Sequence, residues 1–192
     1  MKTIGLIGGL SWESSQLYYR IINETVRKRL GGLNSARLLL NSINFQDVMP
    51  ALSTGDWPEI RRQLVSAAQA LKAGGADCVV LCTNTMHKLA DEIEHASGLP
   101  LLHIADAAAD FILPTGLNRL GLLGTRFTME QDFYIRRLRE QHGFEVIVPE
   151  AEDRAFIDRV IFDELCQGRI LDASRQKYRT IIDTLANRGA EG

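Results

Sequence analysis

Short runs of aliphatic and β-branched residues alternate along the chain with longer amphipathic stretches. The short runs are continuously apolar, which is typical of strands that are covered on both faces of a parallel sheet. They predict strands at Thr3–Gly8, Ala36–Ile43, Asp77–Cys82, Leu101–Ile104, Asn118–Leu123 and Phe144–Val148. The amphipathic stretches predict helices at about 12–29, 57–73, 86–96, 105–112, 127–141, 153–166 and 173–187. This alternation predicts an α/β fold with parallel sheets.

The two halves of the chain share a pattern that favours an internal duplication. Gly5-Leu-Ile-Gly8 and Gly121-Leu-Leu-Gly124 both precede a predicted helix, at an offset of 116 residues. Gly75-Ala76-Asp77 and Gly189-Ala190-Glu191 match at an offset of 114. One such match could recur by chance in any α/β protein, but two in the same order favour duplication. We therefore expect two similar parallel-sheet α/β domains related by pseudo-symmetry.

A cluster of Pro, Gly and Asn at 112–118 predicts the boundary between these domains. We expect a first domain over residues 1–113 and a second over 114–192. Gly75-Ala76-Asp77 leads into a predicted strand, whereas its match in the second half leads only to Gly192. The second domain is therefore expected to be truncated, without its C-terminal strand and helix. The alternative is a strand that is absent by nature, which would leave an exposed sheet edge.

The composition narrows the class of protein. The chain has 192 residues, of which 45% are hydrophobic and 24% charged, as in ordinary globular domains. Lys and Arg number 22 and Asp and Glu 24, with no strongly basic segment, so no nucleic-acid partner is expected. No apolar run approaches the roughly 20 residues of a spanning helix, so no membrane partner is expected either. An odd number of cysteines and the lack of a signal-peptide core predict a cytoplasmic protein.

Polar side chains follow the predicted strands, at the edge where open parallel sheets bind ligands. They are neutral hydroxyls and amides, which suit a small zwitterion or carboxylate and do not resemble a metal site. The candidates are Leu10 and Ser11 after the first strand, Gln46 after the second, Thr83, Asn84 and Thr85 after the third, and Thr125 and Thr128 in the second half.

Several of these positions also have purely structural interpretations. Ser11, Thr125 and Thr128 could each act at a helix N-terminus. The glycines of the first loop do not have the spacing of a dinucleotide-binding loop, so a strand-to-helix turn is favoured. Cys78, Cys82 and His87 are zinc-ligand types, but no second pair follows at finger spacing, and a buried structural role is favoured for Cys78. The remaining thiol and imidazoles are expected in the core or on the surface: Cys166, His95, His103 and His142.

Three motifs in order resemble the aspartate/glutamate racemase family, and the resemblance runs along the whole chain. They are Gly5-Leu-Ile-Gly-Gly-Leu-Ser-Trp-Glu-Ser-Ser-Gln-Leu-Tyr-Tyr19, Leu81-Cys-Thr-Asn-Thr-Met-His87 and Gly124-Thr-Arg-Phe-Thr-Met-Glu-Gln-Asp-Phe-Tyr134. The resemblance implies an amino-acid racemase without cofactor, usually a homodimer. It also implies an active site between two similar domains, so that the 83–85 and 125–128 segments are expected to face one cleft.

The family mechanism implies two cysteines on opposite faces of the substrate Cα, one removing a proton and the other returning one. The family's first cysteine directly precedes Asn-Thr, and here that position is Thr83. Cys82 lies one residue early and, on a strand, would point to the opposite face. Thr83 is therefore the expected catalytic residue, acting directly or through water. Hydroxyl and amide donors would stabilise the carbanion at the substrate carboxylate: Asn84, Thr85, Thr125 and Thr128.

The offset of 114 projects the family's second cysteine to about position 197, beyond Gly192. We therefore expect the natural protein to continue with a further strand that carries this base. The chain that ends at Gly192 would lack it.

The resemblance also implies a substrate range. Acidic-substrate members place an Arg after the second strand and a Lys before the glycine that matches Gly168. Here the 44–52 loop has no Arg, and Gln167 precedes Gly168. Gln46, Met49 and Leu52 could line a mixed pocket instead, which predicts broad specificity.

Two other functions remain open. One is an isomerase or decarboxylase of the same superfamily, of the hydantoin or maleate type, although the Gly-Gly-Leu-Ser-Trp-Glu start speaks against it. The other is a catalytically impaired protein of the same fold that binds a small amino acid or carboxylate.

Overall fold

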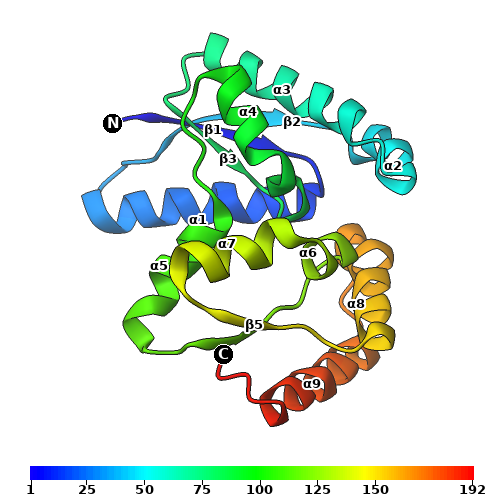
Figure 1. Ribbon diagram of the computed structural model, residues 1–192. Coiled ribbons are helices and arrows are strands. Elements are labelled where there is room, and N and C mark those ends of the chain that lie inside the picture. The colour runs from blue at the N-terminus through cyan, green and yellow to red at the C-terminus, as the bar shows by residue number, and fades with distance from the viewer. The chain divides into compact units, whose positions relative to one another are not determined.

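A three-stranded parallel sheet in the order β2–β1–β3 forms the centre of the first half of the chain (Figure 1). The computed structural model describes residues 1–192, which divide into two units, Met1–His103 and Ile104–Gly192. The strands of the first unit are β1 (Thr3–Gly8), β2 (Arg37–Ser42) and β3 (Cys78–Leu81). The last four residues of β1 are buried, as its unbroken apolar run predicts for a central strand.

Helices of the first unit begin and end at ordinary sequence signals. They are α1 (Trp12–Leu30), α2 (Phe45–Thr54), α3 (Trp57–Ala73) and α4 (Ala90–Ser97), with a 3₁₀ segment η1 (Thr85–Leu89) before α4. Asp56 caps α3 by accepting from the Glu59 N–H, and Pro58 lies in the first turn. Ile60 and Leu64 of α3 are fully buried, together with Leu6, Val79 and Ile93.

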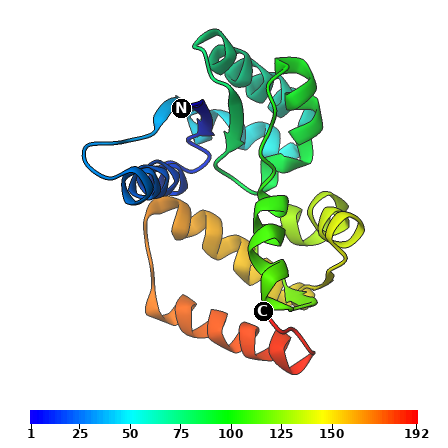
Figure 2. The same cartoon turned by 90° about the vertical axis from the view of Figure 1, so that its left-hand side faces the viewer.

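The second unit contains a smaller parallel sheet of β4 (Arg119–Gly121) and β5 (Glu145–Ile147). Its helices are α5 (Ile104–Ile112), α6 (Arg126–Glu130), α7 (Asp132–His142), α8 (Ala151–Asp163) and α9 (Asp172–Asn187), with 3₁₀ segments η2 (Leu113–Thr115) and η3 (Leu165–Gln167). Helices α8 and α9 pack against each other (Figures 1 and 2). They bury one cluster: Met129, Ile157, Ile181 and Leu185.

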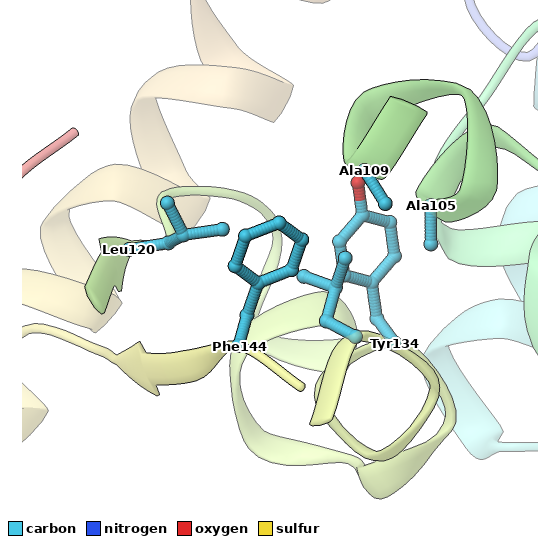
Figure 3. Packing of buried hydrophobic residues seen from close by; sticks show 6 residues of the cluster. Ala105, Ala109, Leu120, Tyr134 and Phe144 are labelled. Carbon is cyan, nitrogen blue, oxygen red and sulfur yellow. The ribbon is translucent and has the colours of Figure 1, made fainter. Parts of the chain in front are cut away.

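A second cluster of this unit joins α5 and α7 to the small sheet. In Figure 3 the Phe144 ring lies between Leu120 of β4 and the Tyr134 ring, and Ala105 and Ala109 of α5 lie beyond that ring. At the rim, Asp106 accepts two hydrogen bonds of 2.7 Å from Arg137 and contacts His142 at 2.9 Å. These contacts bind α5 to the second unit.

The unit boundary therefore precedes α5, whereas the sequence pointed to a division after Leu113. Gly116, in the expected boundary segment, only ends η2, in a left-handed conformation. The division into folding domains stays a prediction, and α5 belongs by its contacts with the C-terminal part.

The predicted pseudo-symmetry is visible in equivalent hydrogen bonds. The Asp77 N–H donates to the Thr3 carbonyl at 2.8 Å, and the Glu191 N–H donates to the Arg119 carbonyl at 2.8 Å. In each unit the carboxylate of the same residue also accepts from the strand N–H, at 2.6 Å from Thr3 and 3.0 Å from Arg119. The α/β class with parallel sheets and two similar halves is confirmed.

A close packing contact repeats as well. A Cβ on Gly5 would lie 3.0 Å from the Ala76 Cβ, and a Cβ on Gly121 would lie 3.5 Å from the Ala190 Cβ. The sequence repeat therefore marks the place where the segment after α3 or α9 packs against the first strand of its unit.

Some predicted elements differ from the structure. The helix expected at 86–96 is divided into the 3₁₀ segment η1 and the helix α4. The 44–52 segment was expected as a loop, but most of it lies in α2, which contains Pro50 in its interior. The expected strand at Leu101–Ile104 is reduced to a single parallel bridge between Leu101 and Val79. The expected helix at 127–141 is divided at Gln131, whose backbone is extended, into α6 and α7.

None of the helices combines the length and hydrophobicity that crossing a membrane would take.

Glu191→Gln is expected to destabilise the second unit at neutral pH. Backbone hydrogen bonds from Asn118 and Arg119 are the main cause that lowers the pKa of the Glu191 carboxyl. A carboxyl with a lower pKa in the folded state stabilises the fold above its unfolded pKa, and this contribution is lost as the pH falls through the folded value. Thermal unfolding should show a lower Tm for the variant at neutral pH and equal Tm values in acid.

The matched control is Glu140→Gln, an exposed carboxylate on α7, which should leave the Tm unchanged at both pH values. Identical melting of the two variants at neutral pH would contradict a stabilising role of Glu191.

Candidate functional site

The carboxyl ends of the three strands of the first unit meet at one edge. In the register of the sheet, Ile7 lies between Asn41 and Leu81. The pairing continues one step further on each side, since the Cys82 N–H donates to the Ile7 carbonyl and the Ile43 N–H to the Gly8 carbonyl, both at 2.9 Å. The segments that follow the strands therefore begin side by side, as expected for parallel strands.

The loop after β1 is held tightly against the end of β2. Gly9 has a φ of 87°, and a Cβ there would collide with the backbone of Ile43. The Gly9 N–H donates to the Ser15 hydroxyl at 2.8 Å, and this hydroxyl donates to the Ser11 carbonyl at 3.1 Å. Leu10 and Ser11 are both buried. Ser11 occupies the N-cap position of α1, but its side chain makes no capping hydrogen bond.

The loop after β3 carries the other candidates of this edge. Thr83 is half-buried, Asn84 is exposed and Thr85 is buried. The Ser14 hydroxyl of α1 donates to the Cys82 carbonyl at 3.0 Å and so ties the first turn of α1 to the end of β3. The structure thus brings Leu10, Ser11 and the 83–85 segment to the same end of one sheet.

The two cysteines of β3 and its end are poor bases. The Cys82 side chain is fully buried, and burial raises the pKa of its thiol to about 12. Burial, with a smaller effect of Asp77, also raises the pKa of the Cys78 thiol at the start of the strand. A protonated thiol cannot remove a proton from carbon. Thr83, which follows Cys82, is half-buried, and the next residue, Asn84, is exposed.

The two candidates on α2 differ in how exposed their side chains are. Gln46 lies in the first turn and is exposed, whereas Leu52 is 4% exposed in a part of α2 that packs with α3. Their roles in substrate binding stay predictions.

The candidates of the second unit bond to each other. Thr125 caps α6, accepting from the Thr128 N–H at 3.4 Å, and the two hydroxyls lie 3.2 Å apart. Thr128 is buried. The helix-cap interpretation of Thr125 is therefore correct, and a role of either residue in substrate binding stays a prediction.

Two buried histidines near Thr83 were not among the candidates. His87 Nδ1 lies 2.8 Å from the Thr83 carbonyl oxygen, and the His87 and His103 rings lie 4.6 Å apart, edge to face. The spacing of four residues from Thr83 to His87 is the signal that the sequence offered. Residue types alone suggested only a zinc ligand there, and the chain has no group of three or more metal-ligating side chains that could hold a metal ion.

A separate pocket of about 570 Å³ lies between the second half of α1 and the 32–35 segment that leads into β2. It is lined by Tyr19, Arg20, Asn23, Glu24, Arg27, Gly32, Leu33, Asn34 and Ser35. The pocket adjoins the start of β2, so it is not the candidate edge. Asn23, which lines this pocket, accepts a hydrogen bond from the Ala36 N–H at 3.0 Å and so connects α1 to the segment before β2.

Comparison with known proteins places this geometry in a family. A family model described as Asp/Glu/Hydantoin racemase matches residues 7–192. The chain belongs to this family.

Solved racemase structures support the same assignment. A candidate Asp/Glu racemase from Yersinia pestis is 52% identical with a TM-score of 0.91, over 100% of this chain and 84% of that one. An aspartate racemase homologue from Pyrococcus horikoshii is 35% identical with a TM-score of 0.82, over 100% and 83%. Picrophilus torridus aspartate racemase, 16% identical with a TM-score of 0.77 over 97% and 77%, shares the fold.

A curated relative is the broad specificity amino-acid racemase RacX of Bacillus subtilis. It is 26% identical over 152 residues, which are 75% of this chain and 63% of that protein. The match thus spans less than two thirds of that relative's length. The predicted resemblance to the aspartate/glutamate racemase family is confirmed.

Gly9→Ala is expected to be far more destabilising than Gly55→Ala. Both glycines have a positive φ, 87° and 73°, which costs an alanine about 1–2 kcal/mol. At Gly55 an added Cβ meets nothing within 4 Å, whereas at Gly9 it collides with the backbone of Ile43. The collision should add about 1–3 kcal/mol. Chemical denaturation measures both values, and equal losses for the two variants would show that the Gly9–Ile43 contact does not constrain this edge.

Proposed function

We propose that the protein is a cofactor-independent amino-acid racemase that inverts Cα by transfer of protons between two bases. Thr83 occupies the first base position, and uncharged side chains are accepted beside acidic ones. The observation that carries the proposal is the position of Thr83, Asn84 and Thr85 at the end of β3 in a chain of the racemase family.

The edge of the first unit supplies neutral hydrogen-bonding groups for an amino acid. Removing the Cα proton places negative charge on the substrate carboxylate, and without an electron sink this charge needs preorganised donors. We assign this role to the exposed Asn84 amide, and we propose the buried Ser11 and Thr85 as further donors. Leu10 contributes an apolar wall beside them. Thr125 and Thr128 stay as predicted further donors.

The base at position 83 is weaker than the thiolate that the family mechanism implies. A free thiol titrates near 8.5, whereas a hydroxyl is a poor base unless a neighbour activates it. Cys82 cannot replace it, because its thiol is buried and its pKa is about 12. We therefore propose that proton removal on the Thr83 side is slow and that the two enantiomers exchange their Cα protons at unequal rates.

The substrate range follows from the charge of α2. The helix carries no basic residue, and its first turn presents Gln46. An acidic side chain gains no ion pair there, so it has little advantage over a neutral one. The broad specificity printed in the name of the Bacillus subtilis relative supports the same proposal.

The function is tested by exchange of the Cα proton in D₂O, using protein expressed from its natural reading frame. NMR follows each enantiomer of aspartate, glutamate, alanine, serine and methionine, together with a 5-substituted hydantoin. We expect protein-dependent exchange of neutral amino acids at rates comparable with acidic ones. Exchange of aspartate and glutamate alone would overturn the proposed range, and exchange of the hydantoin alone would overturn the proposed reaction.

Thr83→Cys is expected to speed Cα-proton exchange of the slower enantiomer by at least about tenfold, because a positioned general base typically contributes 10²–10⁴-fold. The ratio of the two enantiomers' rates should move towards one. Thr83→Ala should slow exchange further. Cys82→Ala is the matched control on the neighbouring residue, and it should leave both rates within about twofold, apart from the destabilisation expected of a small core truncation. Equal rates for wild type and Thr83→Ala would remove Thr83 from the reaction.

The alternative function is a binding protein that has lost catalysis. The observation in its favour is the absence of an accessible thiol at the end of β3. Saturable binding of amino acids by calorimetry, with no exchange at Cα for any enantiomer, would establish this alternative.

We also propose a cytoplasmic homodimer without nucleic-acid partners, as the family resemblance, the free cysteines and the net charge of −2 suggest. Leu17 and Ile21, one turn apart on α1, are 44% and 54% exposed, and we propose that a second subunit covers them. A mass in sedimentation velocity that stays monomeric at all concentrations would contradict the dimer.

A further inference from the structure

His87 is held between two parts of the chain that are both bonded to β3. Its own segment, η1, follows β3 after Thr83 and Asn84, and the His87 N–H donates to the Asn84 carbonyl at 3.0 Å. His103 follows Leu101, the residue that bridges to Val79 of β3. The Leu102 N–H donates to the Val79 carbonyl at 2.9 Å. The His87 and His103 rings meet edge to face with centroids 4.6 Å apart.

The hydrogen bond to Thr83 fixes the tautomer of His87. A carbonyl oxygen can only accept, and His87 Nδ1 lies 2.8 Å from the Thr83 carbonyl oxygen. Nδ1 must therefore carry a hydrogen. In the neutral imidazole, Nε2 is then the nitrogen without one.

This bond also orients the peptide that joins Thr83 to Asn84. The peptide is trans, so its C=O and N–H point in opposite directions. The carbonyl points to the buried ring of His87, which is 3% exposed. Asn84 is an exposed residue of the candidate edge, and its N–H consequently points away from that ring.

We propose that His87 is a positioning residue, which holds the Thr83–Asn84 peptide so that the Thr83 hydroxyl and the Asn84 N–H are presented to the substrate. Its catalytic effect rests on the proposed racemase function, whereas its hold on the peptide does not. The geometry of reacting groups is demanding, since a displacement of about 1 Å can cost about 10²-fold in rate. His103 packs against the same ring, with the two centroids 4.6 Å apart.

The test compares two variants of similar shape that differ in one donor. The amide nitrogen of His87→Asn can take the place of Nδ1, while His87→Leu has no donor. We expect His87→Leu to lower kcat for Cα exchange by at least about tenfold with a smaller change in KM. His87→Asn should recover kcat to within about threefold of wild type. His95→Asn, an exposed position on α4, is the control and should change neither constant.

A purely structural role would lower the Tm and kcat of both variants together, and equal kcat values for His87→Leu and His87→Asn would overturn the proposal. ¹⁵N NMR of the wild-type imidazoles tests the bond without any variant that has to fold. A hydrogen on Nδ1 of His87 is expected, and its absence would overturn the proposal. If wild type shows no exchange at all, the proposed function fails, and the ¹⁵N spectrum alone decides whether His87 holds the peptide.

Discussion

The parallel pairing of β1 with β3 determines what this protein can place at its candidate edge. The last backbone bond of that pairing, from the Cys82 N–H to the Ile7 carbonyl, buries Cys82 and leaves Thr83 as the next residue out. Leu81 and Cys82 are both buried, whereas Thr83 is half-buried and Asn84 exposed, so the chain opens directly after this bond. The Cys82 thiol is thus buried, and we propose that the Thr83 hydroxyl at the next position faces the substrate.

The loops that follow the strands are also closely fitted to one another. Gly9 turns against Ile43, Ser14 bonds to the end of β3, and His87 bonds back to Thr83. Each contact is made to backbone rather than to a mobile side chain. The neutral donors of the edge are therefore preorganised, which is what stabilising a carbanion without an electron sink requires. In the second unit the chain repeats the strand pairing, but there Thr125 caps α6 and its hydroxyl lies 3.2 Å from that of Thr128.

Much of the fold followed from the sequence because its signals are local. The continuous apolar runs located five strands, and Asp56 with Pro58 located the start of α3. Helix α2 was missed because Pro50 usually ends a helix, and here it lies within one. The break at Gln131 had no Gly or Pro to announce it. The glycine repeat was informative because in both units a glycine of the first strand packs closely against the segment that follows a helix.

The candidate site was predictable in part for the same reason. Strand alternation predicted opposite faces for Cys82 and Thr83. The structure buries Cys82 and leaves Thr83 half-buried, and the catalytic role of Thr83 stays a prediction. The hydrogen bond from His87 to Thr83 and the contact with His103 depend on the path of the chain after β3, which residue types do not specify.

The central claim, that an amino acid binds at the carboxyl edge of the first unit, is tested most directly by amide NMR. Alanine and aspartate are titrated into ¹⁵N-labelled protein, and the shifts are assigned along the chain. If an amino acid binds at this edge, the largest saturable shifts are expected at Leu10, Ser11 and residues 83–85. Shifts confined to the pocket between α1 and residues 32–35, with none at the edge, would contradict it.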